Sequence, residues 1–247
     1  MKTIKHLIIP DCQVKPGVPL NHLDWAGKYT AEKRPDVIVC LGDFADMASL
    51  SSYDVGKKKF EGRRLRKDID AAKRGMEILM TPILKASGYY PKLIFTEGNH
   101  EERIERLAEN DPKLDGLVNL QMLGYEEYGW KVYPFLKPAR INGVNYAHYF
   151  PSSVMGYPCR NARTILSKYH QSCVAGHQQG KDVAYSWCAD GRPITSIIVG
   201  SFYQHNEDFL NHFTNRHWRG IVMLHEVRNG AFDEMFVSLN YLRRKYA

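Results

Sequence analysis

Five short apolar segments of the chain each end in polar side chains that can bind a metal ion. The segments are 4–10, 37–41, 93–95, 144–147 and 173–175, and the residues that follow them are Asp11 and Gln13, Asp43, Asn99, His148, and His177 and Gln179. Apolar runs of this length are typical of buried strands in a parallel sheet. Parallel strands present their carboxyl ends at one edge, where open α/β sheets place their ligands. The sequence therefore predicts that these side chains share one metal site.

The string Gly98-Asn99-His100-Glu101 follows the third of these segments and offers two kinds of chemistry. Asn99 provides a neutral oxygen ligand, and His100 beside it provides a proton donor for a bound substrate. Three of the five segments end beside a glycine, which permits a tight turn after a strand. Alone, the string is weak evidence for a site. Its occurrence together with four similar strand ends makes a shared site the stronger interpretation.

The composition is that of a globular chain without membrane segments. Of the 247 residues, 44% are hydrophobic and 25% are charged, which is ordinary for such proteins. No apolar run approaches the roughly 20 residues that span a bilayer, and the first run ends at Asp11, so we expect no leader peptide and no membrane partner. Five cysteines without a C-x-x-C pair favour free thiols, and Cys12 is expected to be a small buried residue. We therefore expect a cytoplasmic protein.

Most of the net charge of +7 comes from residues 57–74, which contain nine lysines and arginines and three acidic residues. A basic run of this kind is often only the solvated face of a helix. This run lies between two of the site-forming strands, so its ends leave and re-enter the fold close to the expected metal site. We therefore predict an anionic partner, a nucleic acid or a nucleotide, whose phosphates contact this run. The residues expected to bind them are Arg63, Arg64, Arg66 and Lys67.

The order of the expected elements indicates an α/β fold. Apolar residues at helical spacing predict helices over 21–33, 63–84, 101–110, 113–122 and 161–169. The first of them joins two strands, which implies a parallel pair with a right-handed crossover. Later strands are expected over 130–133, 139–141, 183–188, 194–200, 221–227 and 231–240. We expect a single domain over 1–247, with 49–90 as a basic, largely helical insertion and 241–245 as a solvated tail.

The order of these motifs resembles that of the calcineurin-like metallophosphoesterases. The chain has Asp11-x-Gln13, Gly42-Asp43-x-x-Asp46, Gly98-Asn99-His100-Glu101, a lone His148 after a strand, and Gly176-His177-x-Gln179. With the strands that follow, the resemblance covers most of the chain. It implies a four-layer β-sandwich flanked by helices, with two metal ions on strand-end loops.

The same resemblance assigns a role to each motif residue. Asp43 would bridge the two metals, Asn99, His148 and His177 would complete one of them, and Asp11 would bind the other. His100 would face the substrate phosphate without binding metal. Asp46 would support the loop around Asp43.

The sequence departs from the family pattern at two positions, and both fall on the second metal. Gln13 and Gln179 stand where the family usually has histidine. With Asp11 and Asp43 they form an all-oxygen ligand set if both amides turn their oxygens inward, and oxygen ligands favour Mg²⁺ or Mn²⁺ over Zn²⁺. We therefore expect two divalent ions, Mn²⁺ or Mg²⁺, with the second held weakly. The alternative is that the second position stays empty and the protein works with one metal or none.

The resemblance implies hydrolysis of a phosphoester by a hydroxide that two metal ions activate. Asp43, Asn99 and His100 are the expected catalytic residues, and His100 would stabilise charge or protonate the leaving group. Arg103 is expected either to hold a phosphate oxygen or to lie on a helix surface.

We expect a phosphodiesterase or nuclease acting on nucleic acid or a nucleotide. A phosphomonoesterase and a binding scaffold without turnover remain as alternatives. A later group of aromatic and basic residues either lines the mouth of the pocket or only packs beside it: Tyr203, His205, His212, Arg216, His217, Trp218 and Arg219.

Overall fold

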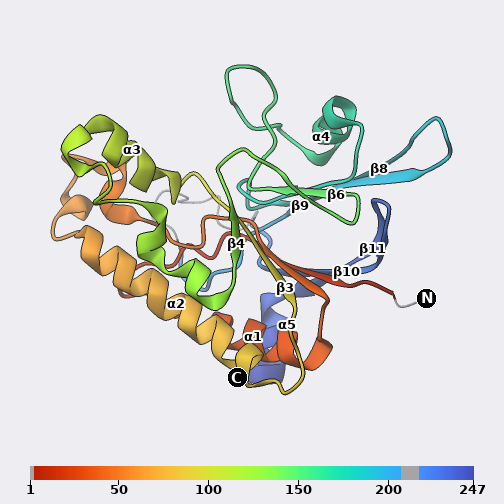
Figure 1. Ribbon diagram of the computed structural model, residues 1–247, viewed down its shortest axis with the longest axis horizontal. Helices are drawn as coiled ribbons and strands as arrows, with labels where there is room; N and C mark the ends of the chain where they lie inside the picture. The colour runs from red at the N-terminus through yellow and green to blue at the C-terminus, as the bar shows by residue number, and fades with distance from the viewer. Residues whose placement is uncertain (1–2, 207–216) are drawn as a thin grey trace.

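The computed structural model describes residues 3–206 and 217–247, which form two β-sheets with helices on their outer faces (Figure 1). The first sheet has the strand order β11-β10-β1-β2-β3-β4, and the second has the order β5-β6-β7-β9-β8. The strands are β1 (His6–Ile9), β2 (Val37–Cys40), β3 (Lys92–Thr96), β4 (Lys131–Tyr133), β5 (Ala139–Ile141), β6 (Val144–Ala147), β7 (Cys173–Ala175), β8 (Lys181–Trp187), β9 (Pro193–Val199), β10 (Gly220–Arg228) and β11 (Ala231–Ser238). The α-helices are α1 (Asn21–Lys33), α2 (Leu65–Lys85), α3 (Glu102–Asn110), α4 (Ala162–Tyr169) and α5 (Leu239–Tyr246).

The strands that lead to the expected site are parallel. β1, β2, β3 and β4 pair in parallel, and β10 and β11 extend the first sheet as antiparallel strands. In the second sheet β6, β7 and β9 are parallel, with β5 and β8 antiparallel at the edges. The loops at the carboxyl ends of both sheets are joined directly, because the N–H of Phe202, after β9, donates to the carbonyl of Asp11, after β1 (2.8 Å).

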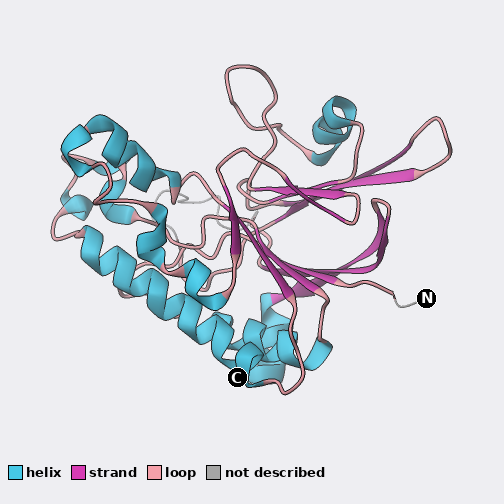
Figure 2. Cartoon of the chain, viewed as in Figure 1, coloured by secondary structure: helices cyan, strands magenta, loops and turns pink. Residues whose placement is uncertain are grey.

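Alternation along the strands divides the core into layers. Leu7 and Ile9 of β1 pack with the buried faces of α1, α2 and α5, whereas Ile8 between them belongs to the apolar layer between the two sheets. On the outer face of the second sheet, Ile165 of α4 packs against β7 and β9. Figure 2 shows the resulting arrangement, in which most helices lie on one side of the paired sheets. The four layers predicted for a β-sandwich flanked by helices are therefore confirmed.

Residues 49–90 contain one long helix, α2, preceded by three short 3₁₀ turns. These are η1 (Ala48–Leu50), η2 (Ser52–Asp54) and η3 (Lys58–Phe60). The guanidinium of Arg63 holds the turns together, because it donates to the carbonyl of Ala48 (2.8 Å) and to the Asp54 carboxylate (2.9 Å). The helix predicted over 63–84 is confirmed as α2, and its apolar face packs into the core through Ile69 and Met76.

Two expectations about local structure are wrong. The sequence predicts a helix over 113–122, but the chain forms only the 3₁₀ turns η4 (Pro112–Leu114) and η5 (Leu120–Leu123) there, because Gly116 takes a left-handed conformation between them (φ 74°). The sequence also predicts a solvated tail over 241–245. Instead, α5 buries Leu242 against the other helices, and Lys245 and Tyr246 bind the carboxylate of Glu32 in α1 (2.6 and 2.7 Å).

Two further expectations concern the membrane and the first loop. Within residues 3–206 and 217–247, no helix combines the length and the apolar content needed to cross a bilayer. Cys12 is buried, as predicted, with 1% of its surface exposed. Its thiol donates to the carbonyl of Pro10 (3.3 Å), and burial raises the pKa of that thiol.

Candidate functional site

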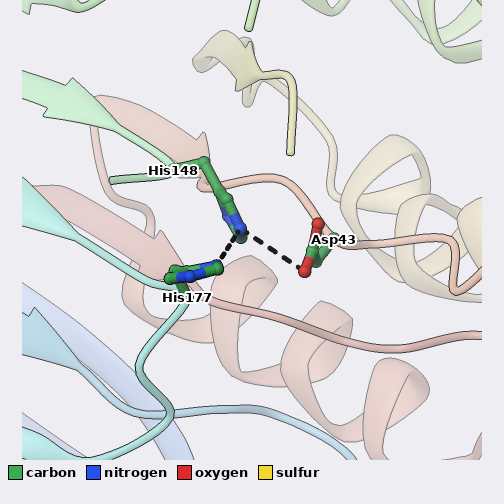
Figure 3. Close-up of side chains that lie close together, drawn as sticks. All are labelled: Asp43, His148 and His177. Atoms are coloured by element: carbon green, nitrogen blue, oxygen red, sulfur yellow. Dashed lines mark hydrogen bonds and ion pairs between the residues drawn. The ribbon is translucent and has the colours of Figure 1, made fainter. Parts of the chain in front are cut away.

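Side chains from four different strand ends converge on one point, and three of them are drawn in Figure 3. His148 Nε2 lies 2.9 Å from Asn99 Oδ1, 3.1 Å from His177 Nδ1 and 3.4 Å from Asp43 Oδ2. His177 Nδ1 also lies 2.9 Å from Asn99 Oδ1. Asp43 follows β2, Asn99 follows β3, and the two histidines follow β6 and β7. We refer to these four residues as the cage.

The spacing of the cage atoms matches that of ligands around one metal ion. Two ligands that are each about 2.1 Å from an ion lie about 3.0 Å apart at a right angle and about 3.4 Å apart at the tetrahedral angle. His148 Nδ1 lies 2.7 Å from the carbonyl of Leu41, so in the neutral ring this nitrogen carries the proton and Nε2 presents a lone pair to the cage. Lone pairs that face one another at these distances are stabilised by a cation between them.

The charges of the cage also favour a cation. Burial alone would raise the pKa of Asp43, but His100 and His148 hold the pKa of its carboxyl far below the ordinary range. Burial opposes protonation of His148, yet Asp43 and Asp11 raise its pKa to about 9. Burial and then the charge of His148 lower the pKa of His177 to about 4. A carboxylate and two imidazoles this close favour one positive charge between them, carried by a proton or by a metal ion.

Two glycine turns allow the loops after β2 and β3 to touch backbone to backbone. A Cβ on Gly42 (φ 80°) would lie 2.4 Å from the nitrogen of Gly98, and a Cβ on Gly98 would lie 2.2 Å from the nitrogen of Asp43. The fully buried carboxylate of Glu101 then accepts the N–H groups of Asp43 (2.8 Å) and Ala45 (2.9 Å). Burial raises the pKa of Glu101 to about 7. Glu101 is thus a positioning residue that the sequence analysis did not assign, although it stands in the Gly-Asn-His-Glu string.

Four non-glycine residues of the site have a left-handed backbone. The φ angles are 48° at Gln13, 46° at Asp43, 65° at His177 and 57° at Gln179. This region is uncommon for residues with a Cβ and costs about 1–3 kcal/mol at each position. The fold therefore fixes the directions of these side chains at the expense of backbone strain, as is common at functional sites.

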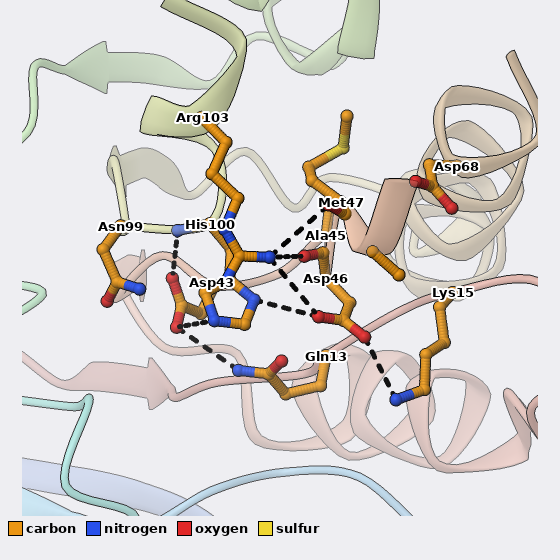
Figure 4. A network of polar contacts seen from close by, with 12 residues as sticks. Gln13, Lys15, Asp43, Ala45, Asp46, Met47, Asp68, Asn99, His100 and Arg103 are labelled. Carbon is orange, nitrogen blue, oxygen red and sulfur yellow. Dashed lines mark hydrogen bonds and ion pairs between the residues drawn. The ribbon is translucent and has the colours of Figure 1, made fainter. Parts of the chain in front are cut away.

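His100 lies beside the cage and is held by two carboxylates (Figure 4). The backbone N–H of His100 donates to Asp43 Oδ1 (2.9 Å). In its ring, Nδ1 lies 3.0 Å from Asp46 Oδ1 and Nε2 lies 3.7 Å from Asp43 Oδ2. Burial opposes protonation, but Asp43 and Asp46 raise the pKa of the imidazole above its ordinary value. Asp46 also pairs with Lys15 (3.0 Å). The arrangement favours a protonated His100 next to the metal position.

Arg103 is held against the loop after β2 rather than lying free on the surface of α3. Its guanidinium donates to the carbonyls of Asp46 (2.9 Å) and Met47 (3.4 Å), and 15% of its side chain is exposed. The same guanidinium lies 4.0 Å from the carboxylate of Asp46, so Arg103 both braces this loop and adds positive charge to it.

The expected second metal position is built differently. Asp11 is fully buried, its Oδ1 accepts the N–H of His177 (3.0 Å), and its Oδ2 has no hydrogen-bond partner among the described residues. Burial, and the nearby charge of Asp43, raise the pKa of Asp11 to about 6. A buried carboxylate oxygen in this state fits a cation.

The sequence predicts an all-oxygen ligand set only if Gln13 and Gln179 both turn their amide oxygens toward the metal position, and in the structure both amides are hydrogen-bonded within the protein. Gln13 Nε2 donates to Asp43 Oδ2 (3.3 Å), and Gln179 Oε1 accepts from the buried hydroxyl of Tyr203 (2.8 Å). Neighbouring groups explain both orientations. The Asp43 carboxylate attracts the amide nitrogen of Gln13, and the buried hydroxyl of Tyr203 requires an acceptor, which Gln179 provides. We call Asp11, Gln13 and Gln179 the glutamine side of the site. Metal ligation by these three residues remains a prediction.

The later aromatic and basic group lies behind the glutamine side. The hydroxyl of Tyr203 is 3.2 Å from His217 Nδ1, and the ring of His205 stacks on the ring of Tyr203 at 4.7 Å. The guanidinium of Arg219 lies over the same ring at 4.7 Å. His212 and Arg216 lie outside the described residues. His205 and Arg219 therefore contact Tyr203, whose hydroxyl donates to Gln179.

A cleft of about 900 Å³ opens from the cage, with Asn99 and His177 among its lining residues. Its walls come from segments 49–60 and 149–158 and from α3. Arg103 and Arg106 of α3 line it, whereas none of the described lining residues comes from 63–67. The sequence analysis did not assign Arg106 or Tyr149, whose ring lies 4.8 Å from that of His177. Phosphate binding by Arg63, Arg64, Arg66 and Lys67 remains a prediction.

Comparison with known proteins finds similarity only among solved structures. No protein-family model matches it, and no curated protein matches its sequence. Among solved structures, it is similar to YfcE, a phosphoesterase from E. coli, with 12% sequence identity, a TM-score of 0.41, and coverage of 96% of this chain and 100% of that one. A second solved chain has 11% identity and the same TM-score. At this level of similarity, the function has to be inferred from the site itself.

Proposed function

We propose that this chain is a metal-dependent phosphoester hydrolase whose substrates are phosphodiesters of a nucleic acid or a nucleotide. The observation that carries the proposal is the cage, in which His148 Nε2 lies 2.9–3.4 Å from Asn99, His177 and Asp43, and the ligand atoms of Asp43, His148 and His177 all lie within 4.8 Å of one another. Mn²⁺ and Mg²⁺ are the proposed ions, because carboxylate and amide oxygens make up half of the cage and Asp11 adds a buried carboxylate oxygen without a hydrogen-bond partner among the described residues. The cage is proposed to bind first, and the glutamine side more weakly.

A divalent ion in the cage supplies Lewis acidity toward a phosphoryl oxygen when it is bound. The other contributions to the reaction come from residues of the chain. Glu101 fixes the backbone of Asp43, and the Leu41 carbonyl fixes the tautomer of His148. His100, whose pKa is raised by Asp43 and Asp46, would donate a proton from its ring to the leaving oxygen or stabilise the charge that develops there. Such a role contributes about 10²–10⁴-fold in typical enzymes.

A diester substrate is favoured over a monoester by the cleft beside the cage. A diester carries a second ester group, and a cleft of about 900 Å³ provides room for it. The cleft contains two arginines and no acidic residue among the described residues that line it.

Assays with Mn²⁺ separate the proposal from its alternatives. We expect hydrolysis of bis-p-nitrophenyl phosphate and of single-stranded DNA, slower hydrolysis of p-nitrophenyl phosphate, and loss of all three activities in EDTA. His100→Asn should lower kcat by about 10²-fold or more without releasing the metal. A preference for the monoester would favour a phosphomonoesterase. Absence of turnover with any divalent metal would favour a binding scaffold.

The salt dependence of DNA binding tests whether the basic segment takes part. Each lost phosphate contact on single-stranded DNA should reduce the slope of log affinity against log salt by about 0.7. The test variant is Arg64→Gln, Arg66→Gln and Lys67→Gln together, which spares Arg63 because that side chain holds the turns before α2. The matched control neutralises two exposed arginines of α5, Arg243→Gln and Arg244→Gln. An equal slope in the wild type and the triple variant would exclude the basic segment.

A further inference from the structure

The cleft beside the cage exposes several large apolar side chains together. Tyr53 is 81% exposed, Val55 67%, Met155 73% and Tyr157 66%, and all four line this cleft. Single exposed apolar side chains are normal, but a group of them around a concave surface marks a binding site. In Figure 1 the loop between β6 and α4, which carries Met155 and Tyr157, rises above the sheets. The cleft thus has one wall from this loop and another from the turns before α2.

Aromatic rings and arginines are combined in this cleft. Tyr53, Phe60, Tyr149 and Tyr157 provide four rings, and Arg103 and Arg106 provide two guanidinium groups. Arg106 donates a hydrogen bond to Glu102. Arg103 donates to backbone carbonyls and lies 4.0 Å from the Asp46 carboxylate. Because no acidic residue is among the described residues that line the cleft, its charge complements an anion that also carries flat apolar groups.

The cleft is continuous with the metal position. Asn99 and His177 of the cage line its floor, and the ring of Tyr149 lies against the ring of His177 at an interplanar angle of 45°. A group esterified to a phosphate at the cage would therefore enter the cleft directly. The volume of about 900 Å³ lies in the range of sites that hold small ligands, which suits one or two nucleotides of a single strand.

We propose that this cleft binds the nucleoside next to the scissile phosphate, with Tyr53 and Tyr157 stacking on the base and Arg106 holding the adjacent phosphate. The inference rests on the proposed function and specifies its substrate as a nucleotide or single-stranded nucleic acid. Stacking on aromatic side chains accepts any base, because every base has a π face. The site therefore binds nucleosides without strong sequence preference.

Chromogenic esters with one common leaving group test the proposal. We compare the p-nitrophenyl esters of thymidine 5′-phosphate and thymidine 3′-phosphate with methyl p-nitrophenyl phosphate, all with Mn²⁺. One nucleoside ester should show a KM lower than the methyl ester by about 5- to 100-fold, and the ester that does so gives the direction of the strand. Tyr53→Ala and Tyr157→Ala should reduce this difference by raising the KM of the nucleoside ester. Tyr53→Phe and Tyr157→Phe should retain it.

Two matched controls separate the cleft from general surface effects. Tyr90→Ala removes a ring that is 93% exposed and does not line the cleft, and it should change nothing. Arg74→Gln breaks an exposed ion pair with Glu77 in α2, in the same way as Arg106→Gln breaks the pair with Glu102 in α3. Of these two arginine variants, only Arg106→Gln should weaken binding of phosphorothioate oligothymidylates in EDTA, measured by fluorescence anisotropy.

The length of the oligothymidylate distinguishes two kinds of site. Equal affinity for two and ten nucleotides would identify a nucleotide site, and tighter binding of the longer strand would identify a strand site.

The outcomes distinguish this inference from the proposed function. Equal KM values for the nucleoside and methyl esters, with metal-dependent turnover of both, would overturn the cleft assignment and leave the hydrolase intact. If no ester is hydrolysed, the hydrolase is wrong, and the binding assay decides the cleft. Oligothymidylate affinity that depends on Tyr53 and Tyr157 would then support a nucleotide-binding cleft, and affinity that does not depend on them would overturn it.

Discussion

The cage and the glutamine side share Asp43, but they use it in opposite ways. In the cage, Asp43 Oδ2 lies 3.4 Å from His148 Nε2, and Asn99 Oδ1 and His177 Nδ1 lie 2.9 and 3.1 Å from the same nitrogen. On the glutamine side, Gln13 places an amide nitrogen 3.3 Å from Asp43 Oδ2, and Gln179 gives its oxygen to Tyr203. The first region needs a cation to be satisfied, and the second is largely satisfied by the protein itself.

The difference shows how the type of side chain decides whether a polar site needs a cation. An imidazole nitrogen without a proton can only accept, whereas a glutamine amide can donate as well as accept. A glutamine can therefore bond to the surrounding protein in place of an ion. The carboxylate of Asp11 has no such freedom, and its buried Oδ2 keeps the demand for a positive charge. Metal affinity should consequently fall steeply from the cage to the glutamine side.

The largest expected effect separates the two regions directly. His177→Asn removes a cage ligand, and the loss of several kcal/mol of Lewis-acid stabilisation should lower kcat/KM for bis-p-nitrophenyl phosphate by about 10³-fold or more. Gln179→Ala should lower it by less than about 10-fold, because Gln179 Oε1 is committed to Tyr203. Steady-state kinetics and the metal content of the purified proteins measure both effects. Similar losses of kcat/KM in the two variants would contradict the distinction between the cage and the glutamine side.

A smaller effect is expected from the carboxylate that supports the cage from behind. Glu101→Gln turns one acceptor oxygen into an NH₂ group that faces the backbone N–H of Asp43 or Ala45. We expect a 10- to 100-fold weaker Mn²⁺ affinity and a free energy of unfolding lower by about 1–3 kcal/mol. Isothermal titration calorimetry and urea unfolding measure the two quantities. Glu109→Gln, at an exposed position of the same helix, is the control, and an unchanged metal affinity in Glu101→Gln would remove the positioning role.

The cage could be predicted in part from the apolar runs that precede its residues. Asp43 and Asn99 follow strands of the first sheet, and His148 and His177 follow strands of the second. Parallel strands bring each pair to one edge, whereas the packing of the two sheets brings the pairs together. The amide directions of Gln13 and Gln179 could not be predicted, since Tyr203 lies 24 residues beyond Gln179 and only the fold brings its hydroxyl near.

The structure of segments without periodic apolar residues could not be predicted either. The cleft wall formed by residues 49–60 consists of 3₁₀ turns, which have no apolar periodicity to read. α5 was missed because it is short and has a single fully buried apolar residue, Leu242. In both places the structure depends on contacts with distant elements rather than on local sequence.

Restoring imidazoles to the glutamine side should make it resemble the cage. Gln13→His with Gln179→His replaces two amides by ligands that favour Zn²⁺ and Ni²⁺, so we expect a second tightly bound ion per chain and activity with a wider set of metals. Elemental analysis after dialysis and activity with each metal measure the change. The control is Gln178→His, because Gln178 donates to the carbonyl of Cys159 and is directed away from the site. An unchanged metal content in the double variant would contradict our assignment of both positions.

The smallest expected effect comes from freeing one amide. Tyr203→Phe removes the hydroxyl that holds Gln179 Oε1 (2.8 Å) and leaves the buried ring in place. A hydrogen bond of this kind contributes about 0.5–1.5 kcal/mol, so the oxygen released toward the metal position should tighten Mn²⁺ binding on the glutamine side by a few-fold, at a similar cost in folding stability. Titration of Mn²⁺ into protein whose cage is already filled measures the weaker site alone. Two outcomes would contradict this prediction. Because Tyr203→Phe leaves the cage residues unchanged, tighter Mn²⁺ binding in the cage would mean that the two regions are not separate.

Weaker Mn²⁺ binding on the glutamine side would mean instead that Tyr203 orients Gln179 toward the ion rather than away from it.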